Sequence, residues 1–197
     1  MNLKEQNIRI FDRIAGSYDR GIIKKWSLRI QRNAVKSLKI ERNSKILDVG
    51  CGTGNLFSAL SSQNKNLRLY GIDISEKMLR IAKTKTRKKA NLRIMPIEKL
   101  NDKNKFDYVF SIDSFHHYYN QDLAFEKMFS ALKKRGKLIV VDVDFGYVFN
   151  KIFHKIEPGN NEILSHLDMI KLFKLNNLKN ITQKRIWLFT FMTIGQK

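Results

Sequence analysis

Hydrophobic and polar positions alternate with two different periods from about residue 45 onward. Short apolar runs, typical of buried strands, are separated by longer stretches in which apolar residues recur every three or four positions, as on one face of a helix. This order predicts βαβ units that build a parallel sheet. The runs predicted as strands are KILDV, LRLYGID, LRIM, DYVFSI and KLIVVDV.

The helices predicted between these strands begin near Gly54, Ser75 and Asn120. Ser75 is a favourable N-cap because its hydroxyl oxygen can accept a hydrogen bond from a free amide of the first turn. The helix after Asn120 is expected to end within LKKRGK. There, basic side chains would face the negative end of the helix dipole, and Gly136 would adopt the left-handed conformation that ends many helices.

Before residue 45 the pattern predicts two helices. The second, IIKKWSLRIQRNAVKSLKI, carries basic residues on one side and an apolar stripe on the other. Basic amphipathic helices can lie on anionic membranes, but such a stripe more often packs on its own domain. The stripe consists of Ile23, Trp26, Ile30 and Ala34.

After residue 160 the pattern predicts a helix and then a hairpin. Ser165 and Asp168 form a capping pair that opens the helix, and Asn177 is suited to a left-handed stop. QKRIWLF and TFMTIGQ follow with almost nothing between them, which predicts a tight antiparallel hairpin. The predicted fold is therefore α/β: a Rossmann-like three-layer sandwich with a mostly parallel seven-stranded sheet and a C-terminal antiparallel hairpin.

Length and composition narrow the class of protein. The 197 residues suffice for one complete core, so a single domain over residues 1–197 is expected. Cys51 is the only cysteine, which excludes an intramolecular disulfide. The start lacks a continuous apolar signal, and the longest apolar run near the end is shorter than the roughly 20 residues that cross a bilayer. We expect a cytoplasmic protein without a transmembrane segment.

The charge adds a question about partners. With 38 basic and 18 acidic residues the formal net charge is +20, which speeds association with anions. Nucleic acid, an acidic membrane or an anionic small molecule would all fit. Lys, Asn and Ile are abundant throughout the chain, however, as a composition bias would produce. The same charge would then reflect only a solvated basic surface.

The motif with the clearest chemistry is KILDVGCGTGN, where a strand runs into Gly50, Gly52 and Gly54. Glycines there let the backbone approach a ligand and adopt angles that a side chain would forbid. Dinucleotide sites use G-x-G-x-x-G, which would require glycine where this chain has Asn55. Asp73 ends the next strand, about 20 residues past the loop, where a carboxylate can accept hydrogen bonds from both hydroxyls of a ribose.

From about residue 8 to the end, the chain resembles class I S-adenosylmethionine-dependent methyltransferases. The resemblance rests on DVGCGTGN, GIDIS, DYVFSIDSFHHYYN and LKKRGKLIVVD. The opening FDRIAGSYD is similar to the N-terminal segment of ubiquinone and menaquinone methyltransferases and their small-molecule relatives. The resemblance implies methyl transfer from S-adenosylmethionine, with S-adenosylhomocysteine as product, to a small acceptor that is anionic or partly apolar.

The resemblance also divides the chain and assigns residues. It implies an N-terminal helical cap at 1–40, a cofactor-binding core at 41–145, and at 146–197 a substrate-cover segment, the last helix and the hairpin. Asp48 is expected near the methionine ammonium group, Gly50 and Gly52 beneath the methionine portion, and Asp73 on the ribose. The remaining cofactor-binding residues expected are Tyr18, Cys51, Ile74, Met78, Ile97, Glu98 and Ser111.

One position departs from the family pattern. Pro96 stands where the family often has an aspartate that accepts from the adenine amino group, and proline offers neither a carboxylate nor an amide hydrogen. Either Glu98 replaces that aspartate, or adenine is held by the Ile97 amide and by apolar contacts.

The loop after the fourth strand contains the candidate catalytic residues. His116 or His117 could take a proton from the acceptor, because histidine titrates near neutral pH; alternatively, these side chains only shape the pocket or start the next helix. No metal site is expected, because adjacent histidines diverge and no HxxxH or CxxC spacing is present. The later segment GYVFNKIFHKIEPGNN would either cover the acceptor or pack on the N-terminal helices.

Two other functions stay open. A nucleic-acid methyltransferase could use TKTRKKANLR for phosphate contacts, although the fourth strand lacks the Asn/Asp-Pro-Pro-Tyr/Phe sequence of adenine-N6 enzymes. A noncatalytic cofactor-binding protein is favoured only by Pro96.

Overall fold

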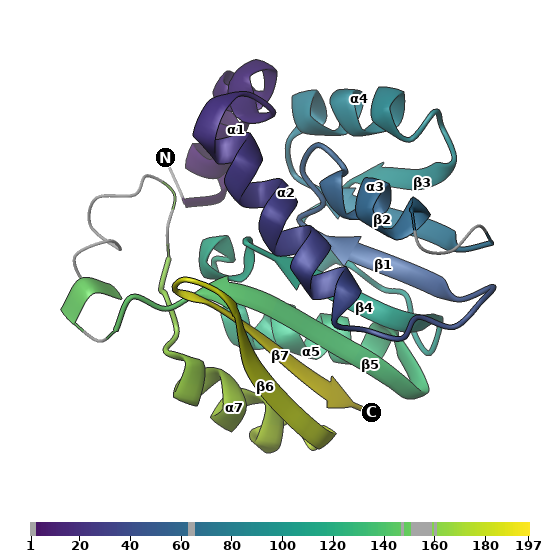
Figure 1. Ribbon diagram of the computed structural model, residues 1–197, viewed down its shortest axis with the longest axis vertical. Helices are drawn as coiled ribbons and strands as arrows, with labels where there is room; N and C mark the ends of the chain where they lie inside the picture. Colours follow the sequence, from purple (N-terminus) through teal and green to yellow (C-terminus); the bar gives the residue numbers. More distant parts are fainter. Residues whose placement is uncertain (1–2, 63–65, 147, 151–158, 160) are drawn as a thin grey trace.

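The strands of the described chain form one seven-stranded sheet in the order β3-β2-β1-β4-β5-β7-β6 (Figure 1). The computed structural model describes residues 3–62, 66–146, 148–150, 159 and 161–197, without the side chains of residues 22 and 23. Five strands are parallel, and the last two form an antiparallel hairpin on β5. They are β1 (Lys45–Val49), β2 (Arg68–Asp73), β3 (Ala90–Ile94), β4 (Phe106–Ile112), β5 (Leu132–Val143), β6 (Lys179–Trp187) and β7 (Thr190–Gln196).

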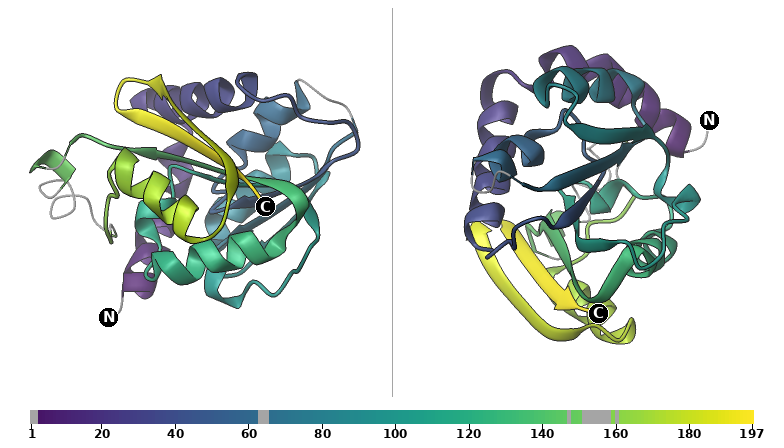
Figure 2. Two further views of the ribbon diagram at one scale, coloured as in Figure 1. Left: turned by 90° about the horizontal axis from the view of Figure 1, so that it is seen from below. Right: turned by 90° about the vertical axis from the view of Figure 1, so that its right-hand side faces the viewer.

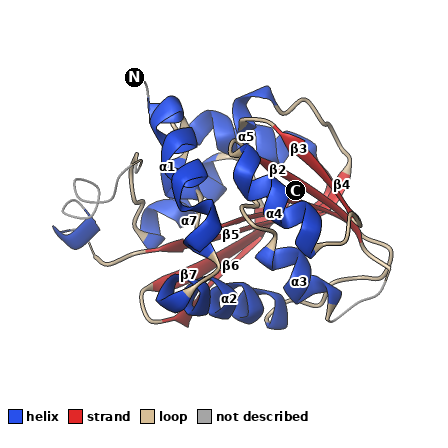
Figure 3. Ribbon diagram, turned by 90° about the horizontal axis from the view of Figure 1, so that it is seen from above, coloured by secondary structure: helices blue, strands red, loops and turns tan. Residues whose placement is uncertain are grey.

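Helices cover both faces of the sheet, as the views in Figures 2 and 3 show. One core contains Ile30, Leu60 and Leu79, from α2 (Gly21–Lys36), α3 (Asn55–Ser61) and α4 (Glu76–Lys85). The other contains Phe125 and Phe173, from α5 (Gln121–Ala131) and α7 (His166–Leu175). The predicted Rossmann-like three-layer sandwich is therefore confirmed.

The strand order decides where a ligand can enter. From β1 the chain moves to β2 and β3 on one side of the sheet, and then returns to β4 on the other side of β1. The connections after β1 and β4 therefore leave the sheet in opposite directions, and a crevice opens at their carboxyl ends. Helix α1 (Leu3–Tyr18) packs against α4 beside this crevice. Among the described residues, no helix combines the length and the apolar character that a membrane crossing requires.

Several local predictions are confirmed by the caps. The hydroxyl of Ser75 accepts from the Met78 amide, and the side chain of Asn120 accepts from the Leu123 amide. Ser165 caps α7 as expected. The stop after α7 also forms, with Asn177 at a φ of 60°.

The predicted end of the helix after Asn120 is wrong. Helix α5 ends at Ala131, and LKKRGK belongs to β5. Arg135, at a φ of 64°, takes the left-handed conformation instead of Gly136. A Cβ on Gly136 would lie 2.9 Å from the Lys133 carbonyl oxygen and 3.0 Å from that of Phe106, so close strand packing explains the glycine.

Two expectations from the sequence fall partly outside the described residues. The predicted stripe on α2 is buried at Ile30 and Ala34, and the side chain of Ile23 is not described. In the predicted cover segment, residues 147, 151–158 and 160 lie outside the described part of the chain. Phe149 is described and is exposed.

Candidate active site

The glycine loop is fixed to the end of the neighbouring strand by main-chain hydrogen bonds. The amides of Gly50 and Cys51 both donate to the carbonyl oxygen of Ile72, at 2.9 and 3.1 Å. Gly50 has a φ of 71°, a left-handed conformation that favours glycine. A Cβ on Gly50 would also lie 2.8 Å from the Cβ of Ser114. The glycine therefore lets the loop after β4 approach the loop after β1.

Asp73 is held by two backbone amides at the end of β2. Its Oδ2 accepts from the Gly52 amide at 2.7 Å, and its Oδ1 accepts from the Ser75 amide at 2.8 Å. Burial raises the pKa of Asp73, and the two amide hydrogen bonds counteract that rise. The carboxylate thus has a fixed orientation beside the glycine loop.

Asp48 is a buried carboxyl group at the end of β1, and no residue of the described part of the chain gives it a cationic partner. Among the described residues, its side chain has no hydrogen bond and no ion pair. Burial, and then the negative charge of Asp73, raise its pKa well above the ordinary value. A carboxylate in this position is costly unless a positive group from elsewhere lies near it.

A cavity opens at the crevice between the ends of β1 and β4. Its floor is the glycine loop, and one wall comes from Asp73 and α4. The segment after β3, residues 95–98, and the loop after β4 form further walls, and α1 closes the top. The predicted residues that line it are Tyr18, Gly50, Cys51, Gly52, Asp73, Ile74, Met78, Ile97, Glu98 and His117.

Three predicted site residues lie behind this lining. The hydroxyl of Ser111 is fully buried and shares hydrogen bonds with Ser114 and Tyr118, which do line the cavity. Asp48 and His116 are buried and are not part of the lining. They can act on a ligand only through the residues in front of them or after a rearrangement.

Two acidic residues of the N-terminal segment, which the sequence did not single out, connect α1 to the cavity. Asp12 accepts from the hydroxyl of Ser75 at 2.6 Å. Asp19 accepts from Lys85 Nζ at 2.6 Å and from the hydroxyl of Thr53 at 3.0 Å. Burial alone would raise the pKa of Asp19, but hydrogen bonds from Lys85 and its neighbours lower it. These contacts hold α1 over the glycine loop.

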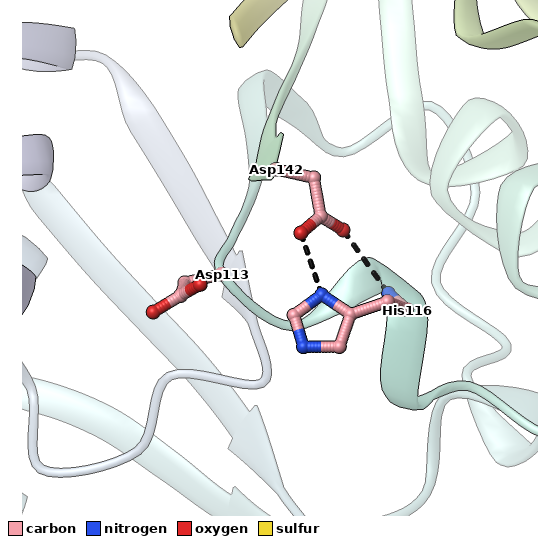
Figure 4. A group of neighbouring side chains, drawn as sticks. All are labelled: Asp113, His116 and Asp142. Atoms are coloured by element: carbon pink, nitrogen blue, oxygen red, sulfur yellow. Dashed lines mark hydrogen bonds and ion pairs between the residues drawn. The ribbon is translucent and has the colours of Figure 1, made fainter. Parts of the chain in front are cut away.

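The two adjacent histidines have different environments. His116 is buried, and its Nδ1 lies 2.5 Å from Oδ1 of Asp142 while its amide donates to Oδ2 at 3.1 Å (Figure 4). His117 faces the cavity, and its Nδ1 lies 3.0 Å from the carbonyl oxygen of Gly159. A carbonyl oxygen only accepts, so Nδ1 of His117 carries the proton and its Nε2 has a lone pair.

The surroundings keep His117 neutral. Burial, followed by the charge of His116, lowers its pKa well below the ordinary value. The ring of Phe11 packs edge-on against it at 5.1 Å between ring centres. Asn7 of α1 donates from Nδ2 to the His117 carbonyl oxygen at 3.1 Å. His117 therefore has an uncharged Nε2 with a lone pair, in a ring that is held in place, and its lowered pKa makes it a weaker base than a histidine in water.

Asp113, His116 and Asp142 have potential metal-binding atoms within 4.8 Å of one another. The oxygens of Asp142 already accept from Nδ1 and the amide of His116 and from the amide of Val143, at 2.9 Å for the last. This set of donors satisfies the Asp142 carboxylate without a cation, and we assign no metal to the group.

Comparison with known proteins identifies the family. The family model of the methyltransferase domain matches residues 40–190. The demethylmenaquinone methyltransferase of Staphylococcus epidermidis is 32% identical over 171 residues, which are 79% of this chain and 70% of that protein. The chain belongs to the methyltransferase domain family. The recognition of a class I S-adenosylmethionine-dependent methyltransferase, similar to menaquinone methyltransferases, is thereby confirmed.

Two further matches give the extent of the likeness. The demethylmenaquinone methyltransferase of Staphylococcus carnosus is 30% identical over 146 residues, and the matched part is 71% of this methyltransferase but 61% of that protein. A putative methyltransferase of Haloferax volcanii, solved in complex with the Trm112 methyltransferase activator, superposes with a TM-score of 0.81 at 17% identity and covers 94% of this chain and 96% of that one. The second match supports the fold alone.

Sequence reasoning about this methyltransferase missed Asn7, Asp12, Asp19 and Asp142. The two acids of FDRIAGSYD stand seven residues apart, a helical spacing that places them on one face, and this was the available signal. Asn7 and Asp142 gain their roles only from contacts with the histidine loop, and their sequence context gives no sign of it.

Proposed function

We propose that this methyltransferase transfers the methyl group of S-adenosylmethionine to a small hydroxylated acceptor, and that His117 removes the acceptor's proton. The observation that carries the proposal is the placement of Asp73 and His117 on the walls of one cavity. An acidic residue suited to a ribose and a neutral histidine thus line the same space.

The residues present fit the cofactor. S-adenosylmethionine, when bound, supplies an electrophilic methyl group on a sulfonium. Asp73 would accept from the ribose hydroxyls, and Ile74, Met78 and Ile97 would pack against the adenine. Asp48 is a buried carboxyl without a cationic partner among the described residues, and it favours a ligand that brings an ammonium group near the glycine loop. Glu98 lines the wall where Pro96 offers no donor or acceptor side chain.

The acceptor end of the cavity is built for proton removal from a hydroxyl group. Nε2 of His117 accepts the proton, and the Gly159 carbonyl stabilises the resulting imidazolium by its hydrogen bond to Nδ1. Phe11 and Tyr119 give the cavity aromatic surface, while Lys4 adds a cation that favours an ionised acceptor oxygen. Tyr118 does not serve as the base, because burial raises the pKa of its hydroxyl, which donates to the Val49 carbonyl oxygen.

The relatives support a quinol-like acceptor. Those from Staphylococcus carry the name demethylmenaquinone methyltransferase, and an aromatic, hydroxylated and apolar molecule of that kind matches the wall chemistry. A nucleic-acid substrate is less well supported, because nothing in the relatives' names points to one.

The test is a turnover assay with labelled S-adenosylmethionine and two hydroxylated naphthoquinols that differ in hydroxyl acidity. His117→Gln should lower kcat strongly with the less acidic acceptor and less with the more acidic one, which is largely ionised in solution. Calorimetry with S-adenosylhomocysteine should give the wild-type affinity for this variant. An equal loss with both acceptors would reject the role of His117, and the absence of any methyl transfer by the wild type would reject the acceptor class.

A further inference from the structure

Exposed apolar side chains lie at the turn of the β6–β7 hairpin and on the segment that follows β5. Leu188 and Phe189 form its turn and are 53% and 52% exposed. The ring of Phe145, just past β5, lies 5.4 Å from that of Phe189 between centres. Val148 and Phe149 follow at 64% and 58% exposure. We call these five residues the apolar tip.

The apolar tip lies at the same edge of the sheet as the cavity. Val143, the last residue of β5, pairs with Thr190, so the turn at 188–189 lies beyond the carboxyl end of β5. β4 runs parallel to β5, and its carboxyl end leads into the histidine loop. In Figure 1 and in the left view of Figure 2, the hairpin turn and residues 148–150 lie at the same end of the molecule.

The turn itself gives no reason for a large apolar residue. Trp187 pairs with Thr190, which leaves a two-residue loop of Leu188 and Phe189. Such loops favour glycine or asparagine because they need positive φ values, and Leu188 has a φ of 27°. A half-exposed leucine in this conformation neither favours the turn geometry nor adds a buried side chain to the core. A contact outside the chain would explain it.

Two arginines, Arg29 of α2 and Arg185 of β6, lie over aromatic rings of the hairpin. The guanidinium of Arg29 lies 5.3 Å from the ring centre of Trp187, and that of Arg185 lies 5.3 Å from the ring centre of Phe191. Both arginines are exposed. Asp144, a buried acid just past β5, is occupied by hydrogen bonds from His166 and from Asn150. The surface around the tip is therefore apolar at its centre and positive at its sides.

This combination fits an anionic lipid bilayer. Aliphatic and aromatic side chains enter the boundary between headgroups and acyl chains, while arginines pair with lipid phosphates. A nucleic acid would use the arginines but would offer nothing for Leu188 and Val148. We propose that the apolar tip docks on the surface of an anionic membrane and brings the cavity mouth close to it. Membrane docking goes beyond the proposed function, and it would bring the enzyme to an acceptor that is dissolved in the membrane.

Vesicle co-sedimentation of the full chain tests the docking. We expect binding to vesicles of phosphatidylcholine with phosphatidylglycerol, and weaker binding to phosphatidylcholine alone. The double variant Leu188→Asn with Phe189→Ser should lose about tenfold or more in vesicle affinity, since buried apolar area is removed. Arg29→Gln and Arg185→Gln should each lose about fivefold, on anionic vesicles only.

Control variants separate docking from misfolding. Asn suits the left-handed conformation at position 188, so the double variant should unfold at the wild-type temperature or above it. Leu175→Asn removes an equally large side chain that is 79% exposed at the end of α7, and should leave vesicle binding unchanged. If Leu175→Asn and the double variant lost vesicle affinity equally, the apolar tip would not be the specific binding site.

The outcomes are separable from those of the proposed function. Turnover of a water-soluble acceptor should be the same for the wild type and the tip variants, whatever the vesicles show. The docking proposal is overturned if the wild type does not bind anionic vesicles. It is also overturned if the apolar tip forms a dimer interface that the double variant disrupts, or if the wild type binds nucleic acid more tightly than vesicles.

Discussion

The two ends of the cavity are held in place by different parts of the chain. At the end proposed for the ribose, Asp73 is fixed by the amides of Gly52, in the loop after β1, and of Ser75, just after β2. At the end proposed for the acceptor, His117 is fixed by Asn7 of α1 and by Gly159, 110 and 42 residues away in sequence. The first end is part of the fold itself. The second depends on segments that can change without disturbing the sheet.

The largest effect expected from this comparison concerns His117. His117→Gln keeps a polar side chain but lacks a group that titrates near neutral pH. We expect kcat to fall by roughly 10²- to 10⁴-fold, the usual contribution of general base catalysis. Steady-state kinetics with the less acidic naphthoquinol measure it, and a fall below threefold would show that the acceptor end needs no base.

In the glycine loop, Gly50→Ala should strain the main chain. The new Cβ would lie 2.8 Å from the Cβ of Ser114, at a φ of 71° that disfavours alanine. Strain of about 1–3 kcal/mol is expected in the free energy of unfolding. Urea unfolding measures this loss. Gly16→Ala is the matched control, because it meets no atom within 4 Å in α1 and should be neutral or slightly stabilising.

The attachment of α1 should matter less. Asp19→Asn weakens the contact with Lys85, at 2.6 Å, while both side chains are about a quarter exposed. We expect a loss of about 1 kcal/mol or less in stability, reduced by solvent screening. S-adenosylhomocysteine should dissociate a few times faster, as stopped-flow fluorescence would show. An unchanged rate would mean that α1 does not control cofactor release.

The smallest effect is a shift in pH dependence. Burial lowers the pKa of His117 below 6.5, so the base stays neutral and active below that pH. Activity should hold at and somewhat below pH 6.5, and fall only as the pH drops through the lowered pKa. The pH at which activity falls on the acidic side is measured from the pH dependence of kcat/KM, with an acceptor that does not itself titrate in this range. An acidic fall in kcat/KM centred at or above pH 6.5 would contradict the assigned environment of His117.

The difference between the two ends also explains what the sequence could predict. The glycine loop, the place of Asp73 at the end of β2 and the Ser75 cap depend on neighbours in the chain, so the sequence could predict where they lie, while their contacts with a cofactor stay a prediction. The end of α5 was mispredicted because Gly136 was taken as a helix cap. The glycine is instead required by the close approach of the Phe106 carbonyl oxygen on another strand. The different surroundings of His116 and His117, on which the proposed choice of His117 rests, were not predictable, since they come from Asp142 and Gly159 in distant segments.

The most direct test of the whole account is calorimetric titration of S-adenosylhomocysteine into the wild type and into Asp73→Asn. We predict binding to the wild type, and an affinity lower by about 1.5–3 kcal/mol in the variant, which loses a charged acceptor of two hydroxyl hydrogen bonds. Equal affinity in both proteins, or no binding to the wild type, would contradict the assignment of the cavity.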